Sequence, residues 1–123
     1  MPNALCHFEL TTRDVAAAKE FYGKVFDWTF EDMEMGDGQV YTGISVKEGP
    51  GGGMMAAPTP EIPTAWLIYV QVDDVTASVT AAKDLGGTVH MERMPVPGMG
   101  WMAVIADPTG GVFGLWQEDK DAK

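Results

Sequence analysis

In the first half of the chain, hydrophobic residues recur in some segments at every second position, as in a strand, and in others at every third or fourth position, as in a helix. Alternation between the two classes predicts strands over residues 5–12, 28–33 and 39–46, with a turn at Gly36, Asp37 and Gly38 and a further extended run at 54–56. Asp14 is placed to cap a helix after the first strand. The apolar stripe of that helix consists of Val15, Ala18, Phe21, Tyr22, Val25 and Phe26.

The second half of the chain has the same order of patterns. It predicts a strand at 64–72, a helix capped by Asp73 or Asp74 and ended by Gly86, and strands at 88–94, 101–106 and 112–117. The residues of 107–110 are typical of a tight turn between the last two strands. From Glu118 onward the tail is polar, and we expect it to fray.

The two halves are copies of one unit. Residues 7–30 align without a gap on residues 67–90, so that Leu10 matches Val70 and Val25 matches Leu85. A repeat of this length indicates a supersecondary unit that cannot bury its apolar face alone. We therefore expect an α+β fold of two strand–helix–strand–strand–strand modules, at about 4–57 and 64–117. They would be joined by a proline-rich linker at 58–63 and form one domain over 1–123, with a cleft between small, mostly antiparallel sheets.

Composition and charge limit the classes of partner that the protein is expected to bind. The net charge is −10, and the eight Lys and Arg residues are scattered, which argues against nucleic acid as a partner. The negative charge either favours a cationic ligand or serves only to keep the protein in solution. No apolar run approaches the roughly 18 residues that a membrane span needs, so no membrane partner is expected. Cys6 is the only cysteine, and with no secretory leader pattern it indicates a cytoplasmic protein.

Alternation along the strands separates a helix-facing set from a cleft-facing set. Side chains of consecutive strand residues point to opposite faces. The set expected under the helices is uniformly apolar and comprises Phe8, Leu10, Ile68, Val70, Val72, Phe113 and Leu115. The set expected to face the cleft is mixed, as binding sites commonly are, and comprises His7, Glu9, Thr11, Tyr69, Gln71 and Trp116. Met54 is a further candidate for lining the pocket.

His7 and Glu9 are the candidate catalytic pair. Residues two apart on one strand face lie about 6–7 Å from each other, so a carboxylate here could act on the histidine or serve as a general base. The alternatives are a solvated polar strand face and binding without catalysis. A second pair, His90 and Glu92, could join them in a metal site of two imidazoles and two carboxylates, or could simply be surface residues.

The opening HFELTTRDVAAAKEFYGKVFDW and the ending ADPTGGVFGLWQ resemble the vicinal oxygen chelate superfamily over roughly residues 4–117. That group contains glyoxalase I, bleomycin-resistance proteins and extradiol dioxygenases, and the chain is most similar to small lactoylglutathione-lyase-related members. The resemblance implies paired βαβββ modules, frequent homodimers and a divalent metal held by four side chains from the first and last strands of the modules. The corresponding positions here are His7, Leu67, Ala56 and Gly114, of which only His7 is a ligand.

These observations lead to three hypotheses. The first is a small-molecule binding protein with a degenerate metal site and no cofactor, which binds and sequesters a cationic or aromatic compound. The alternative is a metal-dependent lyase or isomerase of the glyoxalase I type, which acts on a small carbonyl or thioester compound and uses His7 and Glu9. The third is an interaction module whose fold serves dimerisation alone.

Overall fold

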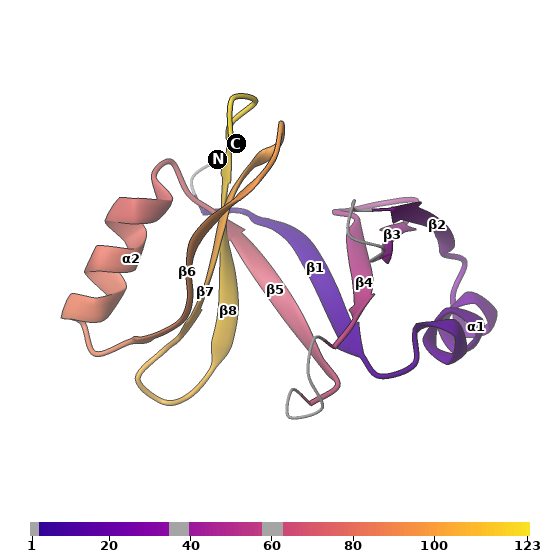
Figure 1. Ribbon diagram of the computed structural model, residues 1–123. Helices are drawn as coiled ribbons and strands as arrows, with labels where there is room; N and C mark the ends of the chain where they lie inside the picture. The colour runs from indigo at the N-terminus through magenta and orange to yellow at the C-terminus, as the bar shows by residue number, and fades with distance from the viewer. Residues whose placement is uncertain (1–2, 35–39, 58–62) are drawn as a thin grey trace. The chain divides into compact units, whose positions relative to one another are not determined.

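The computed structural model describes residues 3–34, 40–57 and 63–123 (Figure 1). The order strand, helix and three strands occurs twice, as the sequence predicts. The elements are β1 (Leu5–Thr12), α1 (Val15–Val25), β2 (Thr29–Glu34), β3 (Val40–Ser45), β4 (Gly52–Ala56), β5 (Ala65–Gln71), α2 (Val75–Asp84), β6 (Thr88–Val96), β7 (Gly100–Ala106) and β8 (Val112–Glu118). The expected α+β class is therefore confirmed. The expected turn at 36–38 and residues 58–62 of the expected linker lie outside the described residues.

The chain divides into two compact units. The first unit comprises residues 7–67, and the second comprises residues 68–123 together with the first six. Antiparallel strand pairs outnumber parallel ones within the two units. Neither described helix is long and apolar enough to cross a membrane.

In the first unit the strands lie in the order β2-β3-β4-β1, and α1 covers one face of the sheet (Figure 1). The side chain of Asp14 caps α1 by accepting a hydrogen bond of 3.0 Å from the amide of Ala17. Leu10 pairs with Met54 across the parallel ladder between β1 and β4, and both side chains are buried with Ile44. The prediction that Leu10 on β1 faces the helix is thus confirmed.

A polar network joins α1 to the sheet at one position where α2 carries a buried apolar residue. Lys19, which the repeat aligns with the buried Val79, contacts both carboxylate oxygens of Asp32 at 3.1 and 3.2 Å. The hydroxyl of the fully buried Thr42 donates to the same carboxylate at 2.7 Å. These hydrogen bonds, that from Thr42 first, lower the pKa of Asp32.

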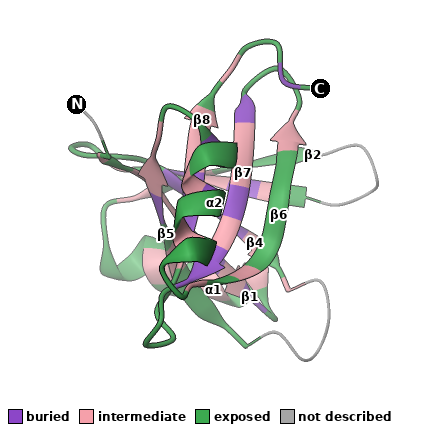
Figure 2. Ribbon diagram, turned by 90° about the vertical axis from the view of Figure 1, so that its left-hand side faces the viewer, coloured by how far each residue is buried: buried purple, intermediate pink, exposed green. Residues whose placement is uncertain are grey.

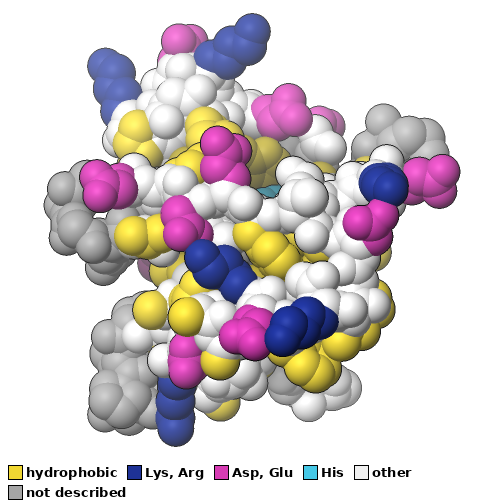
Figure 3. All heavy atoms as spheres, turned by 90° about the vertical axis from the view of Figure 1, so that its right-hand side faces the viewer, with side chains coloured by type: hydrophobic (Ala, Val, Ile, Leu, Met, Phe, Trp, Pro, Cys, Tyr) yellow, Lys and Arg dark blue, Asp and Glu magenta, His cyan; other side chains and the backbone are white. Residues whose placement is uncertain are grey.

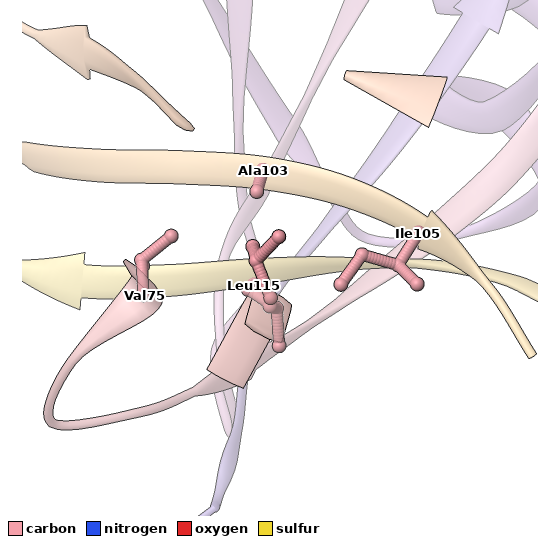
Figure 4. Close-up of a cluster of buried hydrophobic side chains, with 5 residues drawn as sticks. Val75, Ala103, Ile105 and Leu115 are labelled. Atoms are coloured by element: carbon pink, nitrogen blue, oxygen red, sulfur yellow. The ribbon is translucent and has the colours of Figure 1, made fainter. Parts of the chain in front are cut away.

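In the second unit the strands lie in the order β5-β8-β7-β6, with α2 on one face. Figure 2 shows buried stretches along β7 behind α2, whose outer surface is exposed. The core side chains converge from α2, β7 and β8 (Figure 4): Val75, Val79, Ala103, Ile105 and Leu115. Asp74 caps α2 through the amide of Ala77, and the Gln117 side chain accepts from the amide of Val75 at 2.9 Å. A strand side chain therefore fixes the start of this helix.

Two expectations for the second unit are wrong. Ile68, expected under a helix, is 47% exposed. The tail does not fray, because the amide of Gly98 donates to the carbonyl of Ala122 at 2.9 Å and Ala122 is buried. The tail is held because the left-handed Gly98 at the tip of the β6–β7 hairpin turns its amide toward it.

Candidate functional site

His7 and Tyr41 form a hydrogen-bonded pair on the face of the first unit opposite α1. His7 lies on β1 and Tyr41 on β3, and the imidazole Nε2 is 2.8 Å from the phenol oxygen. The two rings are nearly parallel, with an interplanar angle of 19° and a centroid separation of 6.5 Å. The phenol ring lies directly on Gly53 of β4, where a Cβ atom would overlap the hydroxyl group. Only glycine at position 53 lets Tyr41 reach His7 in this way.

Burial favours the uncharged form of both members of this pair. It lowers the pKa of His7 below its usual value of 6.5, which favours the neutral imidazole. It also raises the pKa of Tyr41, and the negative charge of Glu9 raises it further. Glu9 itself is only 8% exposed, on the same face of β1 as His7. The site therefore combines a neutral imidazole and phenol with one nearby carboxylate.

Thr11 lies further along the same face. It pairs with Met55 of β4, and Met55 in turn pairs with Tyr41 of β3. The structure thus places His7, Glu9 and Thr11 together on one face, as the alternation predicts, and adds Tyr41 to them.

The second unit has its own aromatic face opposite α2. Tyr69 pairs with Gly114, and its ring lies so close that the Cζ atom would be 2.9 Å from a Cβ at position 114. Trp116 covers Gly100 in the same manner, with Cζ2 2.7 Å from the Cβ that another residue would carry. Gln71 pairs with Trp116 and so shares this face. The expected grouping of Tyr69, Gln71 and Trp116 is therefore present within the second unit.

Met54 does not line a pocket, contrary to the sequence-based expectation. It is completely buried between Leu10 and Ile44 on the α1 side of the sheet. The reason is strand parity: Met54 pairs with Leu10, whereas its neighbours Gly53 and Met55 pair with Glu9 and Thr11 of the opposite face.

Comparison with known proteins decides the family. Residues 4–115 match the family model described as Glyoxalase/Bleomycin resistance protein/Dioxygenase superfamily. The chain belongs to this superfamily. The glyoxylase-named CFP32 of Mycobacterium tuberculosis is 36% identical over 107 residues, which are 87% of this chain and 41% of the relative. The anthracycline biosynthesis protein DnrV of Streptomyces peucetius is 32% identical over 136 aligned positions, covering 95% of this chain and 48% of DnrV. The chain therefore spans about half the length of these relatives.

Solved structures share the fold at low sequence identity. Methylmalonyl-CoA epimerase from Mycobacterium tuberculosis superposes with a TM-score of 0.69 at 15% identity, covering 94% of this chain and 87% of the epimerase. The hypothetical protein BH1468 of Bacillus halodurans superposes with a TM-score of 0.71 at 14% identity. The superposition covers 100% of this chain and 99% of the BH1468 chain. These two comparisons establish the fold of the superfamily for this chain.

The superfamily often binds a divalent metal, but the residues at the corresponding positions here do not fit one. The assignment of Ala56 to one of the four metal-ligand positions is wrong, because Ala56 pairs with Thr12 and faces the α1 side of the sheet. Its proper counterpart is Gly53, which pairs with Glu9 as Gly114 pairs with Tyr69. The four positions are therefore occupied by His7, Leu67, Gly53 and Gly114.

The two glycines leave no room for a metal-binding side chain. Tyr41 covers Gly53 and Tyr69 covers Gly114, so a carboxylate at either position would overlap a phenol ring. Nowhere in 3–34, 40–57 and 63–123 do three or more His, Cys, Asp and Glu side chains gather closely enough to hold a metal ion. One imidazole is well below the three or four protein ligands that metal sites of this kind use.

The second His–Glu pair does not extend the site. Glu92 forms an ion pair with Lys83 of α2 at 3.4 Å, and His90 is an exposed residue of the same strand. The expectation that His90 and Glu92 would join His7 and Glu9 in a metal site is therefore wrong for the part of the chain that the structure describes.

Proposed function

We propose that this superfamily member binds a small organic molecule without a divalent metal. The observation that carries the proposal is the contact of the Tyr41 hydroxyl with His7 Nε2 over Gly53. This contact engages the one imidazole of the expected metal site. It also creates a donor–acceptor pair for a polar ligand group, beside the carboxylate of Glu9.

We infer that the ligand is planar or cationic. The rings of His7 and Tyr41 are nearly parallel on the face of the first unit opposite α1, which gives this face an aromatic surface. Glu9 and the net charge of −10 favour a positive group. The name of DnrV places one relative in anthracycline biosynthesis, and anthracyclines are planar molecules with an amino sugar. Thr11 would contribute a further polar contact on the same face of β1.

The test uses an anthracycline as the probe. Binding of daunorubicin to chelator-treated protein would be followed by fluorescence anisotropy, with anthraquinone-2-sulfonate as a planar anion for comparison. We expect binding of the cation without metal and weaker binding of the anion. Tyr41→Phe should weaken binding roughly threefold to tenfold, the effect of losing one hydrogen bond, and Met54→Leu should leave it unchanged. Binding that requires added metal, or that is equal in Tyr41→Phe and wild type, would overturn the proposal.

A second candidate is a lyase or isomerase of the glyoxalase type, which rests on Glu9. A carboxylate that is only 8% exposed is desolvated as a general base needs to be, and the Tyr41 hydroxyl is a donor that the sequence did not indicate. The hemithioacetal of methylglyoxal and glutathione is the substrate to try. Turnover that Glu9→Gln abolishes would support this candidate, and absence of turnover would remove it.

We further propose that the protein acts as a cytoplasmic homodimer, as the family resemblance suggests. Sedimentation of the purified chain and localisation of a tagged copy would test the two parts of this statement separately.

A further inference from the structure

The sheet face that carries the proposed ligand site extends across all four strands of the first unit. Cross-strand partners point to the same side of a sheet, so the register of the ladders defines which residues share this face. One row of partners runs across the strands from β1 to β2 and consists of Glu9, Gly53, Gly43 and Glu31. The outer end of this row therefore places a second carboxylate on the face of the proposed site.

The two glycines at the centre of the row are covered by side chains from the neighbouring row. The ring of Tyr41 covers Gly53, and the terminal methyl group of Met33 would lie 3.3 Å from a Cβ at position 43. Met33 pairs with Tyr41 across the β2–β3 ladder and is 43% exposed. The middle of the row is thus a floor made of a phenol ring and a thioether, which can hold the body of a flat organic molecule.

Glu31 is the accessible carboxylate of the row. Glu9 is only 8% exposed, whereas Glu31 is an exposed residue of β2, the outer strand of this unit. Among the residues that the structure describes, no ion pair engages Glu31. Figure 3, seen from the side of α1 and β2, shows hydrophobic side chains at the surface among charged ones. The strand residues paired on this face include no Lys or Arg, so the face favours a positive group.

We infer that Glu31 is a specificity-determining residue of this site and binds the positive group of an elongated ligand. The inference rests on the ligand binding proposed above and adds a direction to it. A polar group of the ligand contacts His7 and Tyr41, its flat body lies over Tyr41 and Met33, and its cation reaches Glu31. Adjacent strands are about 4.8 Å apart, so β1 and β2 are separated by roughly 14 Å. The ligand class is therefore an organic cation whose charge lies up to about 14 Å from its hydrogen-bonding group.

The experiment combines two charge-removing substitutions with two ligands. Fluorescence anisotropy would measure the binding of daunorubicin, and of an N-acetyl derivative that has lost the basic amine, to the chelator-treated chain. Glu31→Gln removes the carboxylate from the face. Glu20→Gln is the matched control, because it removes the same charge from an exposed residue of α1, on the other side of the sheet. Both positions are exposed, so circular dichroism should show folded proteins of similar thermal stability.

We expect Glu31→Gln to weaken the binding of daunorubicin about twofold to fivefold, the effect of one exposed ion pair, and to leave binding of the N-acetyl derivative unchanged. Added salt should reduce the difference between Glu31→Gln and wild type, and Glu20→Gln should bind both ligands as the wild type does.

The outcomes separate this inference from the ligand proposal. A wild type that binds neither ligand without metal would overturn the ligand proposal and the role of Glu31 with it. Daunorubicin binding that Glu31→Gln does not weaken, or that Glu20→Gln weakens equally, would overturn the role of Glu31 alone. Equal weakening of both ligands by Glu31→Gln would also overturn it, because the effect would then not depend on the positive charge.

Discussion

Replacing Gly114 with alanine isolates the contact between Tyr69 and the backbone of β8. Gly114 does not have a positive φ, so alanine is allowed by the backbone, and the only new atom is the Cβ. That atom would overlap the Tyr69 ring, whose Cζ would be 2.9 Å away where carbon atoms normally keep about 3.5–4.0 Å. Tyr69 is 4% exposed and cannot swing into solvent. Overpacking of this kind costs about 1–3 kcal/mol.

Part of this cost is offset, because alanine in a strand is favoured over glycine by roughly 0.5–1 kcal/mol. The difference lies between about 0 and 2.5 kcal/mol. Because three atoms of the Tyr69 ring would lie under 3.0 Å from the new Cβ, we expect Gly114→Ala to lower the free energy of unfolding by about 1–2.5 kcal/mol in urea denaturation. Gly43→Ala is the matched control. Its Cβ would meet the flexible end of Met33 at 3.3 Å and the carbonyl oxygen of Glu31 at an ordinary contact distance of 3.7 Å, so the change should be neutral or slightly stabilising. Equal stability of Gly114→Ala and wild type would refute the placement of Tyr69 on Gly114.

Three further predictions concern the core, the histidine and a helix cap. Met54→Ala should cost about 2–5 kcal/mol in urea unfolding, because the side chain is fully buried, while Met54→Leu should cost under about 1.5 kcal/mol. The folded-state pKa of His7 is lowered, so the unfolded chain binds its proton first as the pH falls; the contribution of His7 to stability is complete above about pH 6.5 and is lost below it. His7→Asn should therefore flatten the dependence of stability on pH below about pH 6.5, and an unchanged slope would contradict the lowered pKa of His7. Asp74→Ala should lower the free energy of unfolding by about 0.5–2 kcal/mol through loss of the α2 cap, an effect that thermal unfolding would detect.

Most of the fold could be predicted from periodicity and the repeat. Both helices begin where a cap was predicted, after Asp14 and after Asp74, the second of the two candidates Asp73 and Asp74. A carboxylate that accepts from the first free amides of a helix is a local feature of the sequence. The side chains of β1 and β8 that face the helices were also predicted, because strict alternation assigns every second residue of a strand to the same face. The exposure of Ile68 was not predicted, because alternation gives the direction of a side chain and does not show whether another part of the molecule covers it.

The errors at Met54 and Ala56 have one cause. The run from Gly51 to Ala57 contains only glycine, methionine and alanine, so it has no alternation of polar and apolar residues from which to assign the faces. Only the ladder with β1 shows that Met54 and Ala56 face α1 and that Gly53 faces the opposite side.

Tyr41 was missed as a site residue because its role depends on three strands at once. The phenol comes from β3, crosses Gly53 of β4 and reaches His7 of β1. The only local signal was a glycine run placed opposite an alternating strand, which indicates a close approach of some large side chain but does not identify it.

The central claim is that the tyrosine-covered glycines and the His7–Tyr41 contact leave no functional metal site. Thermal unfolding of chelator-treated protein with Zn²⁺, Ni²⁺, Mn²⁺, Fe²⁺ or Mg²⁺ tests it most directly. A metal at 100 times its dissociation constant would add about 2.7 kcal/mol, on the order of 10 °C for a domain of this size. We predict no such shift with any of the five metals, in the wild type or in His7→Ala. A shift of that size for one metal, lost in His7→Ala, would contradict the account.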